Sequence, residues 1–205
     1  MNSKYPKRAI RAMQTIARKA GIYGMVGGQT VDVENEGKEM SIDTINYIHN
    51  LKTAALIEGS MMAGAILAGA KAEEIDIVEK IAKSIGVAFQ IQDDILDYTR
   101  TAHTGKPANN DLREGKITLP LLAVLDKAPA ERRTELLGRL ACCHDDEESV
   151  EYLQRTVENE GGLTFAAEVM RSYIARAVEM LSEYEASDYR TALANLCAYI
   201  AERDR

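Results

Sequence analysis

Three aspartates lie in an apolar, helix-patterned stretch of the chain, Phe89-Gln90-Ile91-Gln92-Asp93-Asp94-Ile95-Leu96-Asp97. On a helix Asp93 and Asp97 share a face, and like charges at this spacing destabilise a helix by about 0.2–0.5 kcal/mol. Apolar surroundings increase the cost, because a buried carboxylate needs a partner. Magnesium is commonly held by one or two carboxylates together with water and substrate phosphate. The stretch therefore favours a Mg²⁺ site that includes Asp94, and a solvated acidic stripe is the alternative.

Cationic groups accompany the aspartates in the pairs Lys52-Thr53, Gly105-Lys106 and Gly115-Lys116. Compact positive charges and hydroxyls beside metal-holding carboxylates are what a polyphosphate group requires. Each lysine taken alone also fits a solvated surface position. Gln90 fits either a satisfied core amide or a ligand-facing one. The segment Gly27-Gly28-Gln29 through Asp32 fits either a polar site or a notch for helix packing.

Helical periodicity dominates the chain, and strand alternation is nearly absent. Small residues from Gly59 to Gly69 would let two helix axes approach closely, at some cost in helix propensity. The first expected helix, about residues 7–34, carries one stripe formed by Ile10, Met13, Ala17, Ala20 and Gly24. The others cover about 42–70, 73–100, a helix beginning near Pro120, and then 130–141, 147–159, 162–183 and 188–203. These patterns predict a single all-α domain over residues 1–205.

Composition narrows the functional classes. The chain has 205 residues, of which 46% are hydrophobic and 28% charged, enough to bury a core. A net charge of −7 and the absence of tryptophan argue against nucleic-acid binding, which needs a basic surface. No apolar run is long enough for a transmembrane segment and no signal peptide is evident, so we expect a cytoplasmic protein. The three cysteines, two of them adjacent, make a poor disulfide framework.

Five motifs in a fixed order resemble those of the trans-isoprenyl diphosphate synthases, or polyprenyl synthetases. The resemblance extends from about residue 5 to the C-terminus. The motifs are Gly24-Met25-Val26-Gly27-Gly28-Gln29, Lys52-Thr53-Ala54-Ala55-Leu56, Phe89-Gln90 with Asp93-Asp94-Ile95-Leu96-Asp97, Gly105-Lys106, and Asp111-Leu112-Arg113-Glu114-Gly115-Lys116. The resemblance implies an all-α isoprenoid-synthase helical bundle. It also implies head-to-tail condensation of isopentenyl diphosphate with an allylic diphosphate.

The same resemblance implies roles for individual residues. Asp93 would ligate Mg²⁺ as the first member of the second aspartate-rich motif, supported by Asp94 and Asp97. The allylic diphosphate would be held by Lys52, Lys106 and Lys116, with Thr53 and Gln90 lining its site. Of these, Asp93, Lys52 and Lys106 would be the catalytic residues.

The chain departs from the family pattern in lacking a first aspartate-rich motif before Asp93. It begins where the middle helix of a complete synthase would stand, so we expect the N-terminal helices of the bundle to be missing and the isolated chain to be weak or inactive. Helices deprived of their neighbours would expose apolar stripes, which predicts an oligomer, in the simplest case a homodimer. A non-catalytic subunit that completes a partner synthase is the alternative function. A terpene cyclase shares the fold, but the three lysine motifs favour a synthase.

Overall fold

The computed structural model describes residues 4–35, 41–99 and 108–203. This part of the chain is all-α, as predicted, and contains no strand. In chain order its helices are α1 (Pro6–Ala20), α2 (Met25–Glu34), α3 (Ile42–Lys52), α4 (Ala54–Ala68), α5 (Ala72–Thr99), α6 (Asn110–Arg113), α7 (Leu119–Lys127), α8 (Ala130–Cys142), α9 (Glu147–Asn159), α10 (Gly162–Ser182) and α11 (Asp188–Glu202).

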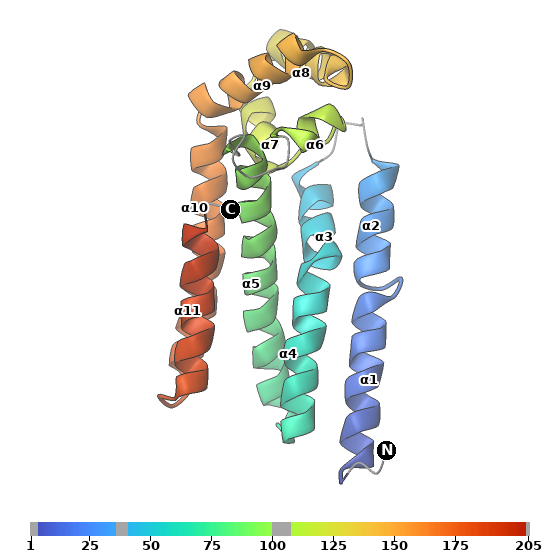
Figure 1. Ribbon diagram of the computed structural model, residues 1–205, viewed down its shortest axis with the longest axis vertical. Helices are drawn as coiled ribbons and strands as arrows, with labels where there is room; N and C mark the ends of the chain where they lie inside the picture. The colour runs from blue at the N-terminus through green and yellow to red at the C-terminus, as the bar shows by residue number, and fades with distance from the viewer. Residues whose placement is uncertain (1–3, 36–40, 100–107, 204–205) are drawn as a thin grey trace.

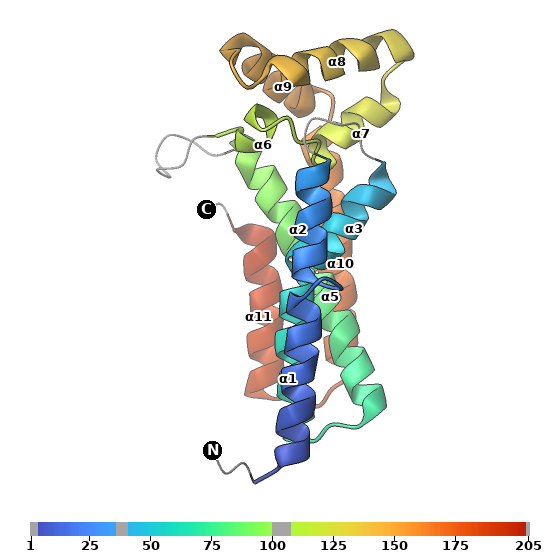
Figure 2. The ribbon, with the colours of Figure 1, turned by 90° about the vertical axis from the view of Figure 1, so that its right-hand side faces the viewer.

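The long helices run along the molecule, and α8 and α9 lie across one end (Figures 1 and 2). Helix α5 is central, because α4 packs against it on one side and α10 on another. Glu73 and Glu74 in its first turn complement the helix dipole. Its buried stripe includes Ile81, Ile85 and Ala88. This arrangement makes α5 the scaffold on which the aspartates are held.

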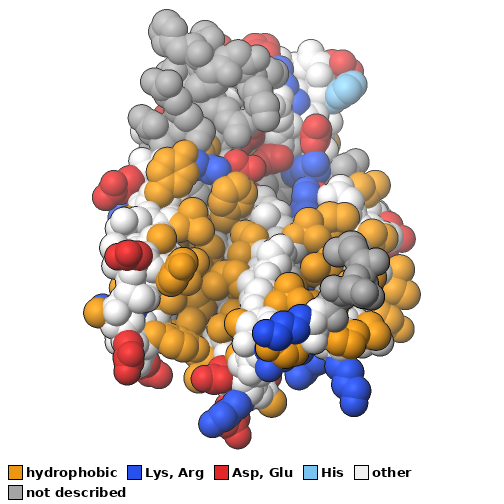
Figure 3. All heavy atoms as spheres, turned by 60° about the horizontal axis from the view of Figure 1, so that its bottom comes forward, with side chains coloured by type: hydrophobic (Ala, Val, Ile, Leu, Met, Phe, Trp, Pro, Cys, Tyr) orange, Lys and Arg blue, Asp and Glu red, His pale blue; other side chains and the backbone are white. Residues whose placement is uncertain are grey.

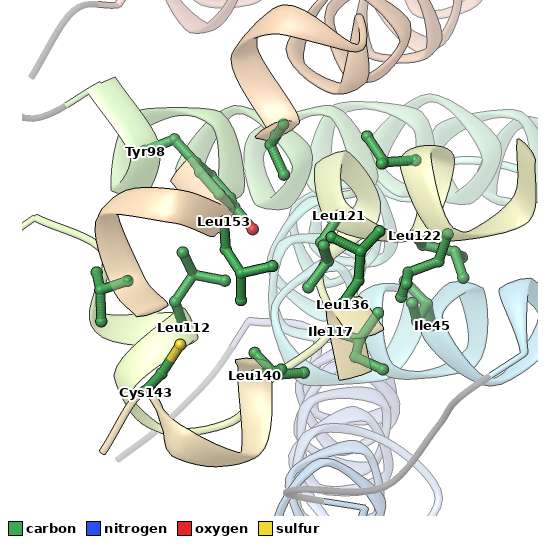
Figure 4. Close-up of a cluster of buried hydrophobic side chains, with 14 of the residues drawn as sticks. Ile45, Tyr98, Leu112, Ile117, Leu121, Leu122, Leu136, Leu140, Cys143 and Leu153 are labelled. Carbon is green, nitrogen blue, oxygen red and sulfur yellow. The ribbon is translucent and has the colours of Figure 1, made fainter. Parts of the chain in front are cut away.

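An apolar core lies between the end of α5 and the short helices α6 to α9 (Figure 4). Leu112, Leu136 and Leu153 are fully buried there. Tyr98, near the C-terminal end of α5, packs in the same cluster. The core therefore fixes the end of α5 against the short helices that follow, and this brings residues 109–118 next to the aspartates.

Two of the predicted helices are each divided in two. The prediction of one helix over 7–34 is wrong, because a turn at residues 21–24 separates α1 from α2. A Cβ on Gly24 would overlap the carbonyl oxygen of Lys19, so this turn requires glycine. The prediction of one helix over 42–70 is also wrong, because α3 and α4 meet at Thr53 with a bend of 44°.

Helix α1 turns an unexpected face toward α4. The guanidinium of Arg8 donates to the Ala68 carbonyl at 3.3 Å, which fastens α1 to the end of α4. Lys19 forms ion pairs with Glu58 of α4 and, at 2.6 Å, with Glu79 of α5. The apolar stripe points elsewhere, and Ile10 and Met13 are 56% and 69% exposed. The exposed stripe agrees with the expectation that α1 lacks a neighbour.

Within the described residues, no single helix has both the length and the apolar composition needed to cross a bilayer; α3 and α4 meet that test together, as a bent pair.

Candidate active site

The predicted site residues converge on one cavity of about 310 Å³. It lies where the α3–α4 break faces the last three turns of α5 and the segment from α6 to the start of α7. Lys52, Thr53, Gln90 and Lys116 line it, as do Asp93, Asp94 and Asp97. Lys106, also predicted for this site, lies outside the described residues. Lys52 and Lys116, which are 64 residues apart in sequence, therefore meet at one place.

The three aspartates have different environments. The side chain of Asp93 is 45% exposed, and its Oδ1 lies 3.0 Å from Nη2 of Arg203. Asp94 is buried and accepts a hydrogen bond of 3.3 Å from the side-chain amide of Gln90. Asp97 is also buried, and its Oδ2 accepts the backbone N–H of Asp111 at 2.9 Å. Asp93 is thus the most open of the three, whereas Asp97 also ties α5 to α6.

The α3–α4 break positions Lys52 and Thr53. Nζ of Lys52 forms a 2.6 Å ion pair with the buried Asp32 of α2. The Thr53 hydroxyl donates to the Oε1 of Gln90 at 2.7 Å. Because the Gln90 amide then donates to Asp94, Thr53, Gln90 and Asp94 form a chain of hydrogen bonds. Gln90 is therefore a hydrogen-bonded amide that also lines the cavity.

Three further carboxylates line the cavity: Asp32, Asp111 and Glu114. The sequence left the segment Gly27-Gly28-Gln29 through Asp32 open between a polar site and a helix-packing notch, and both features are present. Asp32 pairs with Lys52, and a Cβ on Gly28 would lie 2.6 Å from the backbone nitrogen of Lys52. Asp111 and Glu114 belong to the Asp111–Lys116 motif but carried no predicted role. Glu114 forms an ion pair with Lys116. A signal for both acids was present in the motif, because they lie within five residues of a predicted phosphate-binding lysine.

Negative charge dominates the cavity. Six carboxylates line it, against two lysines, among the residues that the structure describes. Burial, followed by the neighbouring charges of Asp94 and Asp97, raises the pKa of Asp111 to about 7. A diphosphate entering this cavity would be repelled unless cations accompanied it. The charge balance therefore fits a ligand that carries divalent cations with it.

The donor set also fits a particular kind of metal site. Nowhere in residues 4–35, 41–99 and 108–203 do three acidic, histidine or cysteine side chains come together as a ready-made metal site. A structural zinc or calcium cage needs several protein ligands. Magnesium is satisfied by one or two carboxylates, with phosphate oxygens and water completing its coordination. Asp93 and its neighbours fit that second pattern.

Comparison with known proteins agrees with the motifs. The profile of the Polyprenyl synthetase family matches residues 1–158. The chloroplastic heterodimeric geranylgeranyl pyrophosphate synthase large subunit 1 of Arabidopsis thaliana is 39% identical over 144 residues, which cover 65% of this chain and 39% of that protein. The chloroplastic geranylgeranyl pyrophosphate synthase of Catharanthus roseus is 43% identical over 124 residues, covering 60% of this chain and 35% of that protein.

Solved structures share the fold over nearly the whole chain. Polyprenyl synthase from Caulobacter crescentus, complexed with calcium and isoprenyl diphosphate, has a TM-score of 0.81 and 27% identity; the match covers 100% of this chain and 60% of that one. Geranylgeranyl pyrophosphate synthetase from Pyrococcus horikoshii has a TM-score of 0.85 and 29% identity, covering 97% and 60%. The chain thus spans about three fifths of these structures, and its alignments span about two fifths of the curated relatives.

Proposed function

Because the chain belongs to the polyprenyl synthetase family, we propose that it takes part in the Mg²⁺-dependent, head-to-tail condensation of isopentenyl diphosphate with an allylic diphosphate. One observation carries the proposal: a single cavity gathers Asp93, Lys52 and Lys116, with six carboxylates in total. Diphosphate chemistry needs such a combination of metal-binding acids and fixed positive charges.

Different residues of the cavity would bind the diphosphate, hold the metal and exclude water. Lys52 and Lys116 would hold the allylic diphosphate, together with Lys106 as the family pattern implies. Asp93 would hold Mg²⁺, with Asp94 and Asp97 orienting its surroundings. When bound, the metal would stabilise negative charge on the departing diphosphate. Ile45, Ile48 and Ile117 also line the cavity and would keep water from an allylic cation. Thr53 and Gln90 would set the position of Lys52 relative to α5.

The isolated chain is expected to be weak or inactive. It spans about 60% of the solved relatives, and its described residues offer no group of three metal ligands. The family pattern places further Mg²⁺ ligands in a first aspartate-rich motif, and the sequence contains no such motif before Asp93.

Asp93→Asn should abolish metal-dependent ligand binding while leaving the fold intact, because Asp93 is partly exposed and the substitution keeps its shape. Calorimetric titration with Mg²⁺ and inorganic pyrophosphate should show binding heat for the wild type. The variant should bind with at least a tenfold lower affinity. The loss of a charge-assisted interaction justifies that magnitude. Asp126→Asn, on the exposed side of α7, is the matched control. Equal heats for Asp93→Asn and the wild type would refute the metal assignment.

The expectation of weak activity has its own test. Robust incorporation of labelled isopentenyl diphosphate by the chain alone would refute it.

A non-catalytic subunit is the second candidate function. The partial span of the fold and the incomplete ligand set favour it. One matching protein is described as the large subunit of a heterodimeric synthase. If this chain completes a partner, labelled isopentenyl diphosphate should be incorporated only when a chain that carries the first aspartate-rich motif is added.

We also propose that the chain forms a homodimer through its exposed apolar surfaces. Large apolar residues gather on the face shown in Figure 3. On α1, α2 and the turn between them, the exposed ones are Ile10, Met13, Ile16, Ile22, Tyr23, Val26 and Val33. Helix α11 exposes Tyr189, Leu196 and Tyr199. Large exposed apolar patches mark protein–protein interaction sites.

Met13→Lys should convert the homodimer to a monomer. Met13 is 69% exposed, so the substitution costs the fold little but places a charge inside the interface. Thr134→Lys, at an exposed position of α8, a helix that contributes none of these exposed apolar residues, is the control and should remain dimeric. Size-exclusion chromatography with light scattering measures both masses. A wild type that is monomeric at micromolar concentration would contradict the proposal.

A further inference from the structure

Arg203 directly follows the last residue of α11, and its side chain lies beside the aspartates of α5. Its Nη2 lies 3.0 Å from Oδ1 of Asp93, although the two residues are 110 apart in sequence. The guanidinium also stacks over the ring of Phe89, with its Cζ 4.4 Å from the ring centroid. The side-chain amide of Gln92 donates to the Arg203 carbonyl at 2.5 Å. Three residues in one turn of α5 therefore hold Arg203.

The arginine side of this contact is sheltered from water: the Arg203 side chain is 12% exposed, whereas that of Asp93 is 45% exposed. The Nε of Arg203 is buried and makes no hydrogen bond in the structure. An arginine normally engages a carboxylate through two parallel hydrogen bonds. Here one hydrogen bond and a stacked ring hold the guanidinium, so the pair is well placed but not fully satisfied.

The partner of Arg203 distinguishes it from the other cations of the site. Lys52 pairs with Asp32, and Lys116 pairs with Glu114, and neither carboxylate is a predicted metal ligand. Arg203 pairs with Asp93, the most open of the predicted ligands. A metal ion that approaches this oxygen meets both an occupied lone pair and a positive charge.

We propose that Arg203 is an internal counter-ion that competes with the divalent cation for Asp93 and thereby sets the metal affinity of the site. The inference rests on the proposed function, in that Asp93 holds the metal. Its consequence is reciprocal: metal binding weakens the attachment of the α11 end to α5, and that attachment weakens metal binding by the same factor.

Metal affinity provides the first test. In calorimetric titrations with Mg²⁺ in the presence of inorganic pyrophosphate, Arg203→Ala should bind Mg²⁺ about three- to tenfold more tightly than the wild type. Arg203→Lys keeps the charge but loses the planar stacking group and should lie between them. Arg190→Ala is the matched control, because Arg190 lies near the start of α11, the helix that precedes Arg203, and its Nη1 donates to the Tyr184 carbonyl instead of an aspartate. Unchanged or weaker binding in Arg203→Ala would overturn the proposal.

A second measurement separates competition from a purely structural role. A double-mutant cycle of Asp93→Asn and Arg203→Ala, read from urea unfolding in EDTA, should show a favourable coupling between the two residues. The coupling should disappear in Mg²⁺ and pyrophosphate, because the wild-type pair is then already broken. Coupling that persists at saturating metal would overturn the proposal. A wild type that binds no Mg²⁺ would refute the proposed metal site as well, whereas normal binding without an Arg203 effect refutes this inference alone.

Discussion

Gly86→Ala is expected to destabilise the protein by about 2–3 kcal/mol, even though alanine is the better helix former. Gly86 lies where α5 crosses α4, and a Cβ at this position would stand 2.5 Å from the Cβ of Ala54. Neither helix can give way easily, because Ala54 is fully buried. The two helices must separate. Since Thr53 precedes Ala54, and Gln90 lies one turn after Gly86, the Thr53–Gln90 hydrogen bond should lengthen too.

Gly64→Ala is the matched control for this prediction. Gly64 belongs to α4, and a Cβ there meets no atom within 4 Å. The substitution should therefore stabilise the protein by about 0.5–1 kcal/mol through helix propensity alone. Urea unfolding measures both values, and calorimetry with Mg²⁺ and pyrophosphate measures the effect on the site. Similar changes of stability in the two variants would show that α4 and α5 are not in close contact at Gly86.

Asp111→Asn is expected to make the metal-free protein more stable at alkaline pH. Desolvation and the charges of Asp94 and Asp97 raise the pKa of Asp111 to about 7 in the folded state, from its usual value near 4. The folded protein therefore holds this proton more tightly than the unfolded chain does. Stability is lost as the pH rises from about 4 to 7, and the full penalty remains above pH 7. Between pH 5 and pH 8 the wild type should lose about 2–3 kcal/mol through this group.

Urea unfolding in EDTA at the two pH values tests the prediction. The advantage of Asp111→Asn over the wild type should be larger at pH 8 than at pH 5 by that amount. Asp126→Asn on the exposed side of α7 should show no such difference. If the free energies of unfolding of the wild type and Asp111→Asn depend on pH in the same way, the pKa of Asp111 is not raised in the folded state. A cation bound in the cavity should reverse the effect, because it favours the ionised carboxylate.

The fold class and the helix positions could be predicted because helical periodicity is a local property of the sequence. The two helix breaks could not. Threonine is tolerated within a helix, so Thr53 does not signal a break between α3 and α4. At this break the Thr53 hydroxyl donates to Gln90, which is 37 residues away in sequence. The orientation of α1 was equally hidden. Periodicity shows that Ile10 and Met13 share a face, but not whether that face meets α4 or remains exposed.

The candidate site was partly predictable for the same reason. Asp93, Asp94 and Asp97 fall on one helix, so their spacing alone places them together. The convergence of Lys52 and Lys116 with them followed from the family motifs, not from spacing. Asp32 and Arg203 enter the site from α2 and from the end of α11, through long-range contacts that no local pattern records.

The ionic attachment of α1 has a consequence for how the protein responds to salt. Arg8 and Lys19 fasten α1 to α4 and α5, and Ala12 is the one fully buried side chain of this helix. Dissolved ions weaken exposed ion pairs most, and the Lys19 and Glu58 side chains are only 20% and 7% exposed. Sulfate and phosphate salts strengthen apolar burial, and Ala12 of α1 packs in one cluster with Ala63 and Ile66 of α4. Concentrated ammonium sulfate should therefore leave α1 docked on α4, because one attachment is shielded from the salt and the other is strengthened by it.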